Sequence, residues 1–357
     1  MSSKVMRYAS LVAAALLVAC AAPSDRPSQP EASSAFRVGL NSATASKHMA
    51  ASANPLATEA GREILRAGGS AVDAAIAIQM VLTLVEPQSS GIGGGAFLLH
   101  WDGRKVIAYD GRETAPAAAD EKLFLLPDGK AMPFYDAVVG GRSVGTPGAV
   151  RMLEVAHKQY GKLPWARLFE PAIRLADAGF PMSARLNMQL AGEKYLKNDA
   201  TAAAYFYAAD GTPKAVGTMM RNPALAATLR ALAANPSALY IGEIPADIVK
   251  AVGAHANAGR LAVSDFTAYQ VKQREPICTD YKQWRVCGFP PPSSGGIAVA
   301  QMLALLSARN IAASPPAGAM GPEGKLELSS DAVHLFSEAG RLAFADRGLY
   351  VADSDFV

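Results

Sequence analysis

Apolar residues recur every three or four positions over residues 54–67, a spacing that predicts an amphipathic helix. A proline near its start and the glycine pair at 68–69 suit the two ends of such a helix. The next segment, 70–85, is apolar around almost its whole circumference, and Ser70 and Asp73 have the spacing of a capping box. We therefore expect an amphipathic helix followed by a buried one.

A hairpin and a series of helices are predicted downstream. Two apolar runs, 97–101 and 105–109, flank an Asp-Gly pair at 102–103, which is the residue pair most typical of a tight β-turn. Thr146 is expected to be the N-cap of the helix that follows it. The remaining patterns predict helices over residues 147–160, 168–178, 224–234, 245–258, 264–269, 297–306 and 331–347, and a Pro/Gly-rich loop over 312–324.

A second hairpin is predicted over residues 275–289, with a two-residue turn at 282–283. In that register Cys278 faces Cys287, and the two Cβ atoms come within reach of a disulfide. Neither Lys nor Gln is a favoured turn residue, so two unlinked thiols stay open as the alternative. An oxidising compartment would favour the bond, which would then be structural rather than catalytic.

The N-terminus has the features of an export signal. A short basic start and an apolar stretch precede LVAC at 17–20, which is similar to a bacterial lipobox, where the cysteine becomes the lipid-carrying N-terminus. An ordinary signal peptide cut nearby, with Cys20 incidental, is the alternative. We expect a lipoprotein signal over residues 1–19, a flexible Pro/Ser/Ala-rich tether over 20–35 and a folded region over 36–357. This predicts export and lipid anchoring to a bacterial membrane, with the domain in the periplasm.

Composition narrows the class of protein. The 357 residues are 50% hydrophobic and 18% charged, which excludes disordered, collagenous and coiled-coil chains. Loss of Lys4 and Arg7 with the signal lowers the net charge from +3 to +1, so no nucleic-acid partner is expected.

The histidines lack metal-ligand spacing, and we expect neither a metal nor a cofactor. The glycine run at 91–95 follows a helix and precedes a strand, the reverse of a dinucleotide-binding loop, so close backbone approach is its simpler role.

Arg112 is the side chain with the clearest chemical potential. It follows the first hairpin, and its position leaves two roles open: a surface arginine paired with Glu113, or a bidentate clamp for a substrate carboxylate. Ser293 and Ser294 are candidate nucleophiles, but no base is evident near them in the sequence. A turn with an N-cap is the simpler role for these two serines.

Several motifs occur in a fixed order over residues 50–357. They are NPLATEAG at 54–61, GGSAVDAA at 68–75, PQSSGIGGG at 87–95, RETAP at 112–116, GTPG at 145–148, PPPSSGG at 290–296, AFADR at 343–347 and DFV at 355–357. Together they resemble the large subunit of the γ-glutamyltransferase (glutathione hydrolase) family. An ordered set of this kind is much more specific than any single motif.

The resemblance implies an α/β (α+β) fold, an incomplete αββα sandwich of the N-terminal-nucleophile hydrolases with mostly helical outer layers. A precursor in this family cuts itself into a large and a small subunit. The new N-terminal threonine of the small subunit attacks the γ-glutamyl carbonyl of glutathione, with its own α-amine as the base. The acyl-enzyme then passes to water or to an amino-acid or dipeptide acceptor. The arginine of the family's R-E-x-A-P motif, Arg112 here, would bind the α-carboxylate of the glutamate.

The chain resembles the large subunit only, so the threonine nucleophile and the Gly-Gly oxyanion hole are expected downstream of Val357, on a small subunit. Loss of a single oxyanion donor already costs ~10²–10³-fold in rate, so the chain alone is expected to be inactive. Glutathione or another γ-glutamyl compound is the expected substrate. Two alternatives stay open: a cephalosporin or glutaryl-amide acylase, in which Arg112 would still hold a carboxylate, and a non-catalytic lipoprotein that binds γ-glutamyl compounds.

Overall fold

The computed structural model describes residues 43–307, 319–320, 326–327 and 329–357. The predicted signal over 1–19, the tether over 20–35 and Cys20 lie outside these residues. Within the described part of the chain, no helix has both the length and the apolar character that a bilayer span requires.

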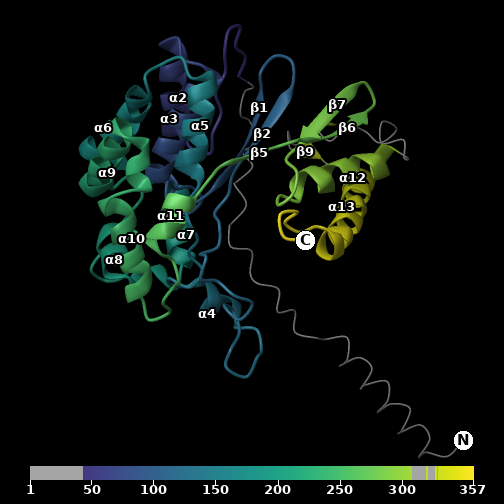
Figure 1. Ribbon diagram of the computed structural model, residues 1–357. Coiled ribbons are helices and arrows are strands. Elements are labelled where there is room, and N and C mark those ends of the chain that lie inside the picture. The colour runs from purple at the N-terminus through teal and green to yellow at the C-terminus, as the bar shows by residue number, and fades with distance from the viewer. Residues whose placement is uncertain (1–42, 308–318, 321–325, 328) are drawn as a thin grey trace, which may run out of the picture. The chain divides into compact units, whose positions relative to one another are not determined.

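Helices predominate, and the strands are short (Figure 1). The described helices are α2 (Pro55–Arg66), α3 (Ala71–Val85), α4 (Phe134–Val138), α5 (Ala149–Tyr160), α6 (Glu170–Ala178), α7 (Ala184–Gly192), α8 (Ala200–Phe206), α9 (Pro223–Ala234), α10 (Glu243–Ala254), α11 (Val263–Ala268), α12 (Gly295–Ser307) and α13 (Ser330–Tyr350). The described strands are β1 (Ala96–Trp101), β2 (Val106–Gly111), β3 (Phe180–Pro181), β4 (Met219–Met220), β5 (Lys272–Arg274), β6 (Ile277–Tyr281), β7 (Trp284–Gly288), β8 (Ala319–Met320) and β9 (Leu326–Glu327). The first hairpin, β1–β2, is extended by β5 into an antiparallel sheet with the order β1-β2-β5, and the other strands pair two by two.

The first two helices begin at side-chain caps, of which the one at Ser70 was predicted from the sequence. The Asn54 carboxamide oxygen accepts from the Leu56 amide at 3.0 Å, which caps α2. Ser70 and Asp73 form a reciprocal capping box at α3, with contacts of 2.8 and 3.1 Å. Asp73 also accepts from the backbone amides at 162 and 163, so the same carboxylate fixes the loop that follows α5.

The start of α5 differs from the prediction. The helix begins at Ala149 with Gly148 as its N-cap residue, and Thr146 caps nothing. Thr146 instead forms an isolated antiparallel bridge with Thr114, in which its amide donates to the Thr114 carbonyl at 2.9 Å. This pairing keeps the backbone extended up to the helix, because a tertiary contact competes with the local capping preference. It also attaches the start of α5 to the segment that follows β2.

The second hairpin, β6–β7, has the register expected from the sequence. Tyr281 pairs with Trp284 across the two-residue turn, and Lys282 adopts the left-handed backbone conformation that such a turn requires. Cys278 pairs with Cys287, and their sulfurs form a disulfide. The loop predicted over 312–324 is interrupted by β8, which pairs with β9, and most of its other residues lie outside the described part.

The largest core cluster is built around α3. Ile76, Met80 and Val81 of this helix are completely buried, and α3 packs against α2 and α5 (Figure 1). Strand β2 joins the same core through Tyr109, which is also completely buried. Burial of Tyr109 therefore fixes the end of β2, from which the chain leaves the sheet after Gly111.

Glu86 is a buried charge at the C-terminal end of α3, with a side chain that is 2% exposed. It accepts hydrogen bonds from the Asn54 carboxamide at 2.9 Å and the Gln88 carboxamide at 2.6 Å, and it forms an ion pair with Arg185 of α7. Three donors from three parts of the chain thus converge on one carboxylate. A buried charge is tolerated when it is paired and hydrogen-bonded in this way.

Replacement of Glu86 by alanine is expected to lower the free energy of unfolding by about 3–5 kcal/mol, because one half of a buried ion pair is removed. Glu59→Ala is the control, since Glu59 is exposed and pairs only with Arg62 one turn along α2. That control is expected to stay within about 0.5 kcal/mol of the parent. Urea unfolding followed by circular dichroism measures both variants, and similar losses in the two would contradict the role of Glu86.

Candidate functional site

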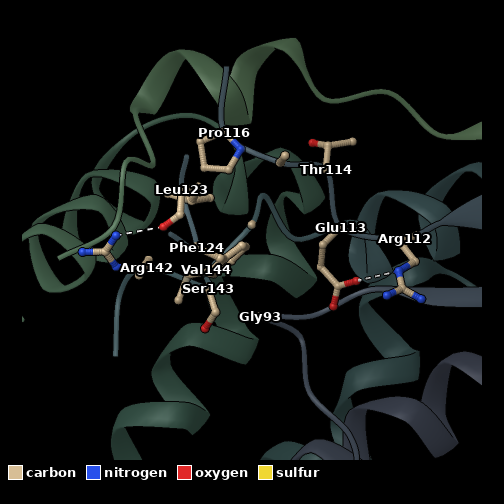
Figure 2. Close-up of a pocket in the computed structure, with 12 residues that line it drawn as sticks. Gly93, Arg112, Glu113, Thr114, Pro116, Leu123, Phe124, Arg142, Ser143 and Val144 are labelled. Atoms are coloured by element: carbon tan, nitrogen blue, oxygen red, sulfur yellow. Dashed lines mark hydrogen bonds and ion pairs between the residues drawn. The ribbon is translucent and has the colours of Figure 1, made fainter. Parts of the chain in front are cut away.

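A pocket of about 490 Å³ lies between the segment after β2 and the segment before α5 (Figure 2). Its lining is formed by Gly93 and by residues 112–116, 123–124 and 142–145. Two arginines and one glutamate are the charged side chains of this lining. The excess of positive charge favours an anionic ligand.

Arg112 combines a fixed backbone with an exposed guanidinium. Its amide donates to Asp110 Oδ1 at 3.0 Å, and its carbonyl accepts from the Tyr269 hydroxyl at 2.8 Å. The side chain is 59% exposed, and Nε lies 3.8 Å from Glu113 Oε2, which is too long for a hydrogen bond. The guanidinium carbon also lies 6.0 Å from the centre of the Phe97 ring. Arg112 therefore keeps the donors that a carboxylate ligand would use.

Two stacked tyrosines hold the backbone around Arg112. Burial raises the pKa of Tyr269 far above its usual value, so its hydroxyl stays protonated and able to donate to the Arg112 carbonyl. Tyr240 stacks on Tyr269 with ring centres 6.0 Å apart, and burial raises its pKa to about 12. The Tyr240 hydroxyl donates to the Pro147 carbonyl and accepts from the Arg151 amide, both at 3.0 Å. The tyrosine pair thus connects the site to the first turn of α5.

Glycines allow the backbone to pass very close to the site. A Cβ on Gly95 would lie 2.6 Å from the Glu113 nitrogen and 2.8 Å from the Arg112 Cα, and the Gly95 amide donates to Glu113 Oε1 at 2.7 Å. A Cβ on Gly148 would lie 1.9 Å from the Tyr269 hydroxyl. Gly95, the last residue of the run at 91–95, thus serves close backbone approach, the simpler role expected for the run from the sequence, whereas Gly91 and Gly93 have no such close contact among the described residues.

Arg142 is the second arginine of the pocket, and its side chain hydrogen-bonds to two other segments of the chain. Its Nε donates to the Asn257 side-chain oxygen at 2.6 Å, and one terminal nitrogen donates to the Leu123 carbonyl at 2.8 Å (Figure 2). Asn257 in turn donates to the carbonyls of Asp136 and Val139. These contacts fix the far side of the pocket, opposite Arg112 in Figure 2. Sequence reasoning did not single out Arg142.

The other candidates have structural contacts. The Gly295 amide donates to Ser293 Oγ at 3.2 Å, and Arg347 Nε donates to Ser294 Oγ at 2.8 Å, so both serines take part in the turn before α12. Cys278 and Cys287 are joined in the β6–β7 hairpin. Among the described residues, no group of three or more His, Cys, Asp or Glu side chains is arranged to hold a metal ion.

The partners of Arg112 were not found from the sequence. Asp110 is only two residues away, but a carboxylate just after a strand carries no distinctive signal. Tyr269 lies 157 residues further along the chain, at the end of α11, and nothing local to it indicates this contact. Only the fold brings these residues together.

Comparison with known proteins identifies the family. The family model described as Gamma-glutamyltranspeptidase matches residues 57–357. This chain belongs to the γ-glutamyltranspeptidase family. The resemblance noted in the sequence motifs is thereby confirmed.

Curated relatives in this family include a hydrolase and an acylase. The glutathione hydrolase proenzyme of Bacillus subtilis (strain 168) is 35% identical over 87% of this chain and 51% of the relative. The acylase ACY 1 proenzyme of Pseudomonas sp. (strain V22) is 38% identical over 88% of this chain and 55% of the relative. The chain thus spans about half the length of the curated relatives that it matches.

The fold is that of solved γ-glutamyltranspeptidases. The crystal structure of Helicobacter pylori γ-glutamyltranspeptidase matches with a TM-score of 0.81 and 30% identity, covering 89% of this chain and 88% of that chain. The predicted α+β fold, with the helical layers of an N-terminal-nucleophile hydrolase, is confirmed. Arg112 lies in the RETAP segment at 112–116 and lines the pocket of Figure 2.

Replacement of Gly95 by alanine is expected to push the Arg112–Glu113 backbone away from β1 and to lower the free energy of unfolding by about 1–3 kcal/mol, as overpacking does. Gly93→Ala is the matched control, because no heavy atom lies within 4 Å of the position its Cβ would take. That variant is expected to unfold within about 0.5 kcal/mol of the parent. Equal stabilities of the two variants in urea would contradict the close packing at Gly95.

Proposed function

We propose that this chain is the large-subunit part of an enzyme that removes the γ-glutamyl group from glutathione and related γ-glutamyl compounds. The proposal rests on Arg112, whose backbone is held at both its amide and its carbonyl while its side chain, which lines the pocket, is 59% exposed. The planar fork of an arginine matches the two oxygens of a carboxylate. Arg112 would bind the α-carboxylate of the glutamate and so orient the γ-carbonyl.

The proposed reaction uses a threonine acyl-enzyme. The hydroxyl of an N-terminal threonine on the small subunit attacks the γ-carbonyl, and its α-amine passes the proton to the departing amide nitrogen of cysteinylglycine. Water or the amine of an acceptor then attacks the ester and releases the glutamyl group, which restores the threonine hydroxyl. In this scheme the present chain orients the donor and supplies no nucleophile, so we propose that it is inactive alone.

A small subunit is the proposed partner, and the surface of α13 supports this. The helix exposes large apolar side chains to between 55% and 78%: Phe336, Leu342, Phe344, Leu349 and Tyr350. Exposed apolar groups gathered on one element favour a protein interface. Both curated relatives described above are named proenzymes, which fits a precursor processed into two chains.

Acylase activity on glutaryl amides is the second candidate function, because an acylase is among the relatives of this chain. A glutaryl group has a terminal carboxylate at a similar distance from its amide, and Arg112 could bind it in the same way. It lacks the α-amine of glutamate. Parallel assays of the assembled enzyme with glutathione and with a glutaryl amide therefore decide between the two functions.

In the assembled enzyme, Arg112→Ala is expected to lower kcat/KM for glutathione roughly 10- to 100-fold, because a charge-assisted hydrogen bond contributes about 1.5–3 kcal/mol. Arg104→Ala is the matched control, since Arg104 is an exposed arginine on the β1–β2 turn. It is expected to leave kcat/KM unchanged. Steady-state release of glutamate measures both variants, and an unchanged value for Arg112→Ala would refute its role as the carboxylate clamp.

We also propose that the protein is a lipoprotein. Removal of residues 1–19 would leave Cys20 as a lipid-carrying N-terminus, with residues 20–35 as a tether between a bacterial membrane and a periplasmic domain. The basic start, the short apolar stretch and the LVAC sequence support this placement.

The Cys20→Ser variant is expected to incorporate no labelled fatty acid and to move from the detergent phase to the aqueous phase on phase separation, because the thiol that receives the lipid is gone. The parent protein should partition into detergent. Partitioning of the variant that equals the parent's would rule out this anchor.

A further inference from the structure

The carboxylate of Asp110 contacts two different parts of the site. Its Oδ1 accepts from the Arg112 amide at 3.0 Å, and its Oδ2 accepts from Arg274 Nε at 2.7 Å. Both charged side chains are largely buried, with 8% of Asp110 and 14% of Arg274 exposed. Asp110 thus connects the backbone of Arg112 to β5.

Arg274 holds a second carboxylate with the remaining nitrogens of the same guanidinium. Its two terminal nitrogens donate to the two oxygens of Asp355, one of them at 3.2 Å. Lys272 lies two residues before Arg274 on β5, so the two side chains point to the same face of the strand. The Lys272 ammonium donates to Asp355 Oδ2 at 2.7 Å. A guanidinium can serve two carboxylates at once because its five donors are spread over a rigid plane.

Asp355 belongs to the segment 351–357, which follows α13. The hydrogen bonds from Arg274, and then those from Lys272, hold the pKa of Asp355 well below its usual range. The carboxylate is therefore charged throughout the neutral pH range. Among the described contacts, this ion-pair cluster is what attaches the segment to β5.

We propose that Arg274 is a positioning residue for the Arg112 site, because it fixes Asp110 with one nitrogen and the 351–357 segment with the other two. The placement of that segment then sets the backbone of Arg112, and with it the affinity for the γ-glutamyl donor. This inference rests on the proposed function of Arg112 as the carboxylate clamp. Arg274 touches no substrate in this scheme and acts through Asp110.

The first test follows the backbone directly. In the full chain, Arg274→Gln and Asp355→Asn are both expected to speed hydrogen–deuterium exchange at the Arg112 amide. The first variant removes the side chain that holds the acceptor Asp110, and the second removes the carboxylate that holds that side chain in place. Arg230→Gln is the matched control, since Arg230 pairs with Asp177 between α9 and α6. The control should leave exchange at Arg112 unchanged.

The second test uses the assembled enzyme. Arg274→Gln and Asp355→Asn are expected to raise KM for a γ-glutamyl donor roughly 2- to 30-fold, the range for changes that act on a site through other residues, with little change in kcat. The double variant should show no larger effect than Arg274→Gln alone, because both residues act through one connection. Arg274→Lys should give partial rescue at most, since an ammonium cannot bridge two carboxylates with the same geometry.

Parent-like amide exchange at Arg112 and a parent-like KM in Asp355→Asn would overturn the proposal, provided that circular dichroism shows the variant to be folded. Additive effects of the two substitutions would overturn it as well.

Failure of the proposed function would give a different result. In that case Arg112→Ala would leave KM unchanged, while the amide-exchange measurement would still report whether Asp355 and Arg274 fix the Arg112 backbone.

Discussion

Direct contact between glycine backbone and the segment 110–114 is the constraint on which the site depends. Any side chain at Gly95 or Gly148 would overlap with Glu113 or Tyr269. Because both positions lack one, the entry to β1 and the first turn of α5 can lie against the same short stretch of chain. The Gly94 carbonyl then accepts from the amides of Gly148 and Ala149 at 3.1 Å, which holds the two segments together.

This packing separates a rigid part of the site from an adaptable one. The Arg112 backbone is fixed by Asp110 and Tyr269, whereas its side chain is more than half exposed and its Nε lies 3.8 Å from Glu113 Oε2. Binding of a ligand carboxylate would therefore carry no free-energy cost for reorganising the backbone. On the far side, Arg142 donates to two neutral oxygens, those of the Asn257 side chain and the Leu123 carbonyl, which ties together the segments that line the pocket there.

Local signals predicted the local structure well. The capping box at Ser70 and the pairing of Cys278 with Cys287 depend on residues within ten positions of one another, and the structure has both. The predicted hairpin β1–β2 also forms, but Trp101 pairs with Val106, so its turn is centred on residues 103–104, one residue beyond the Asp-Gly pair expected at 102–103. Thr146 was misjudged because its backbone pairs with Thr114, a contact that no helix-capping rule anticipates. The motif resemblance pointed to Arg112, but Tyr269 and Arg274 reach the site only through tertiary packing.

Because Tyr269 contacts Arg112 from far along the chain, no short peptide around Arg112 contains all the groups that position it. A peptide covering 91–116 would contain the arginine, its neighbouring carboxylates and the glycine run, yet it would lack the Tyr269 hydroxyl that donates to the Arg112 carbonyl. It would also lack the amides at the head of α5. The geometry around Arg112 is thus a property of the tertiary structure, and a graft of residues 112–116 onto another protein would carry the side chains without the contacts that position them.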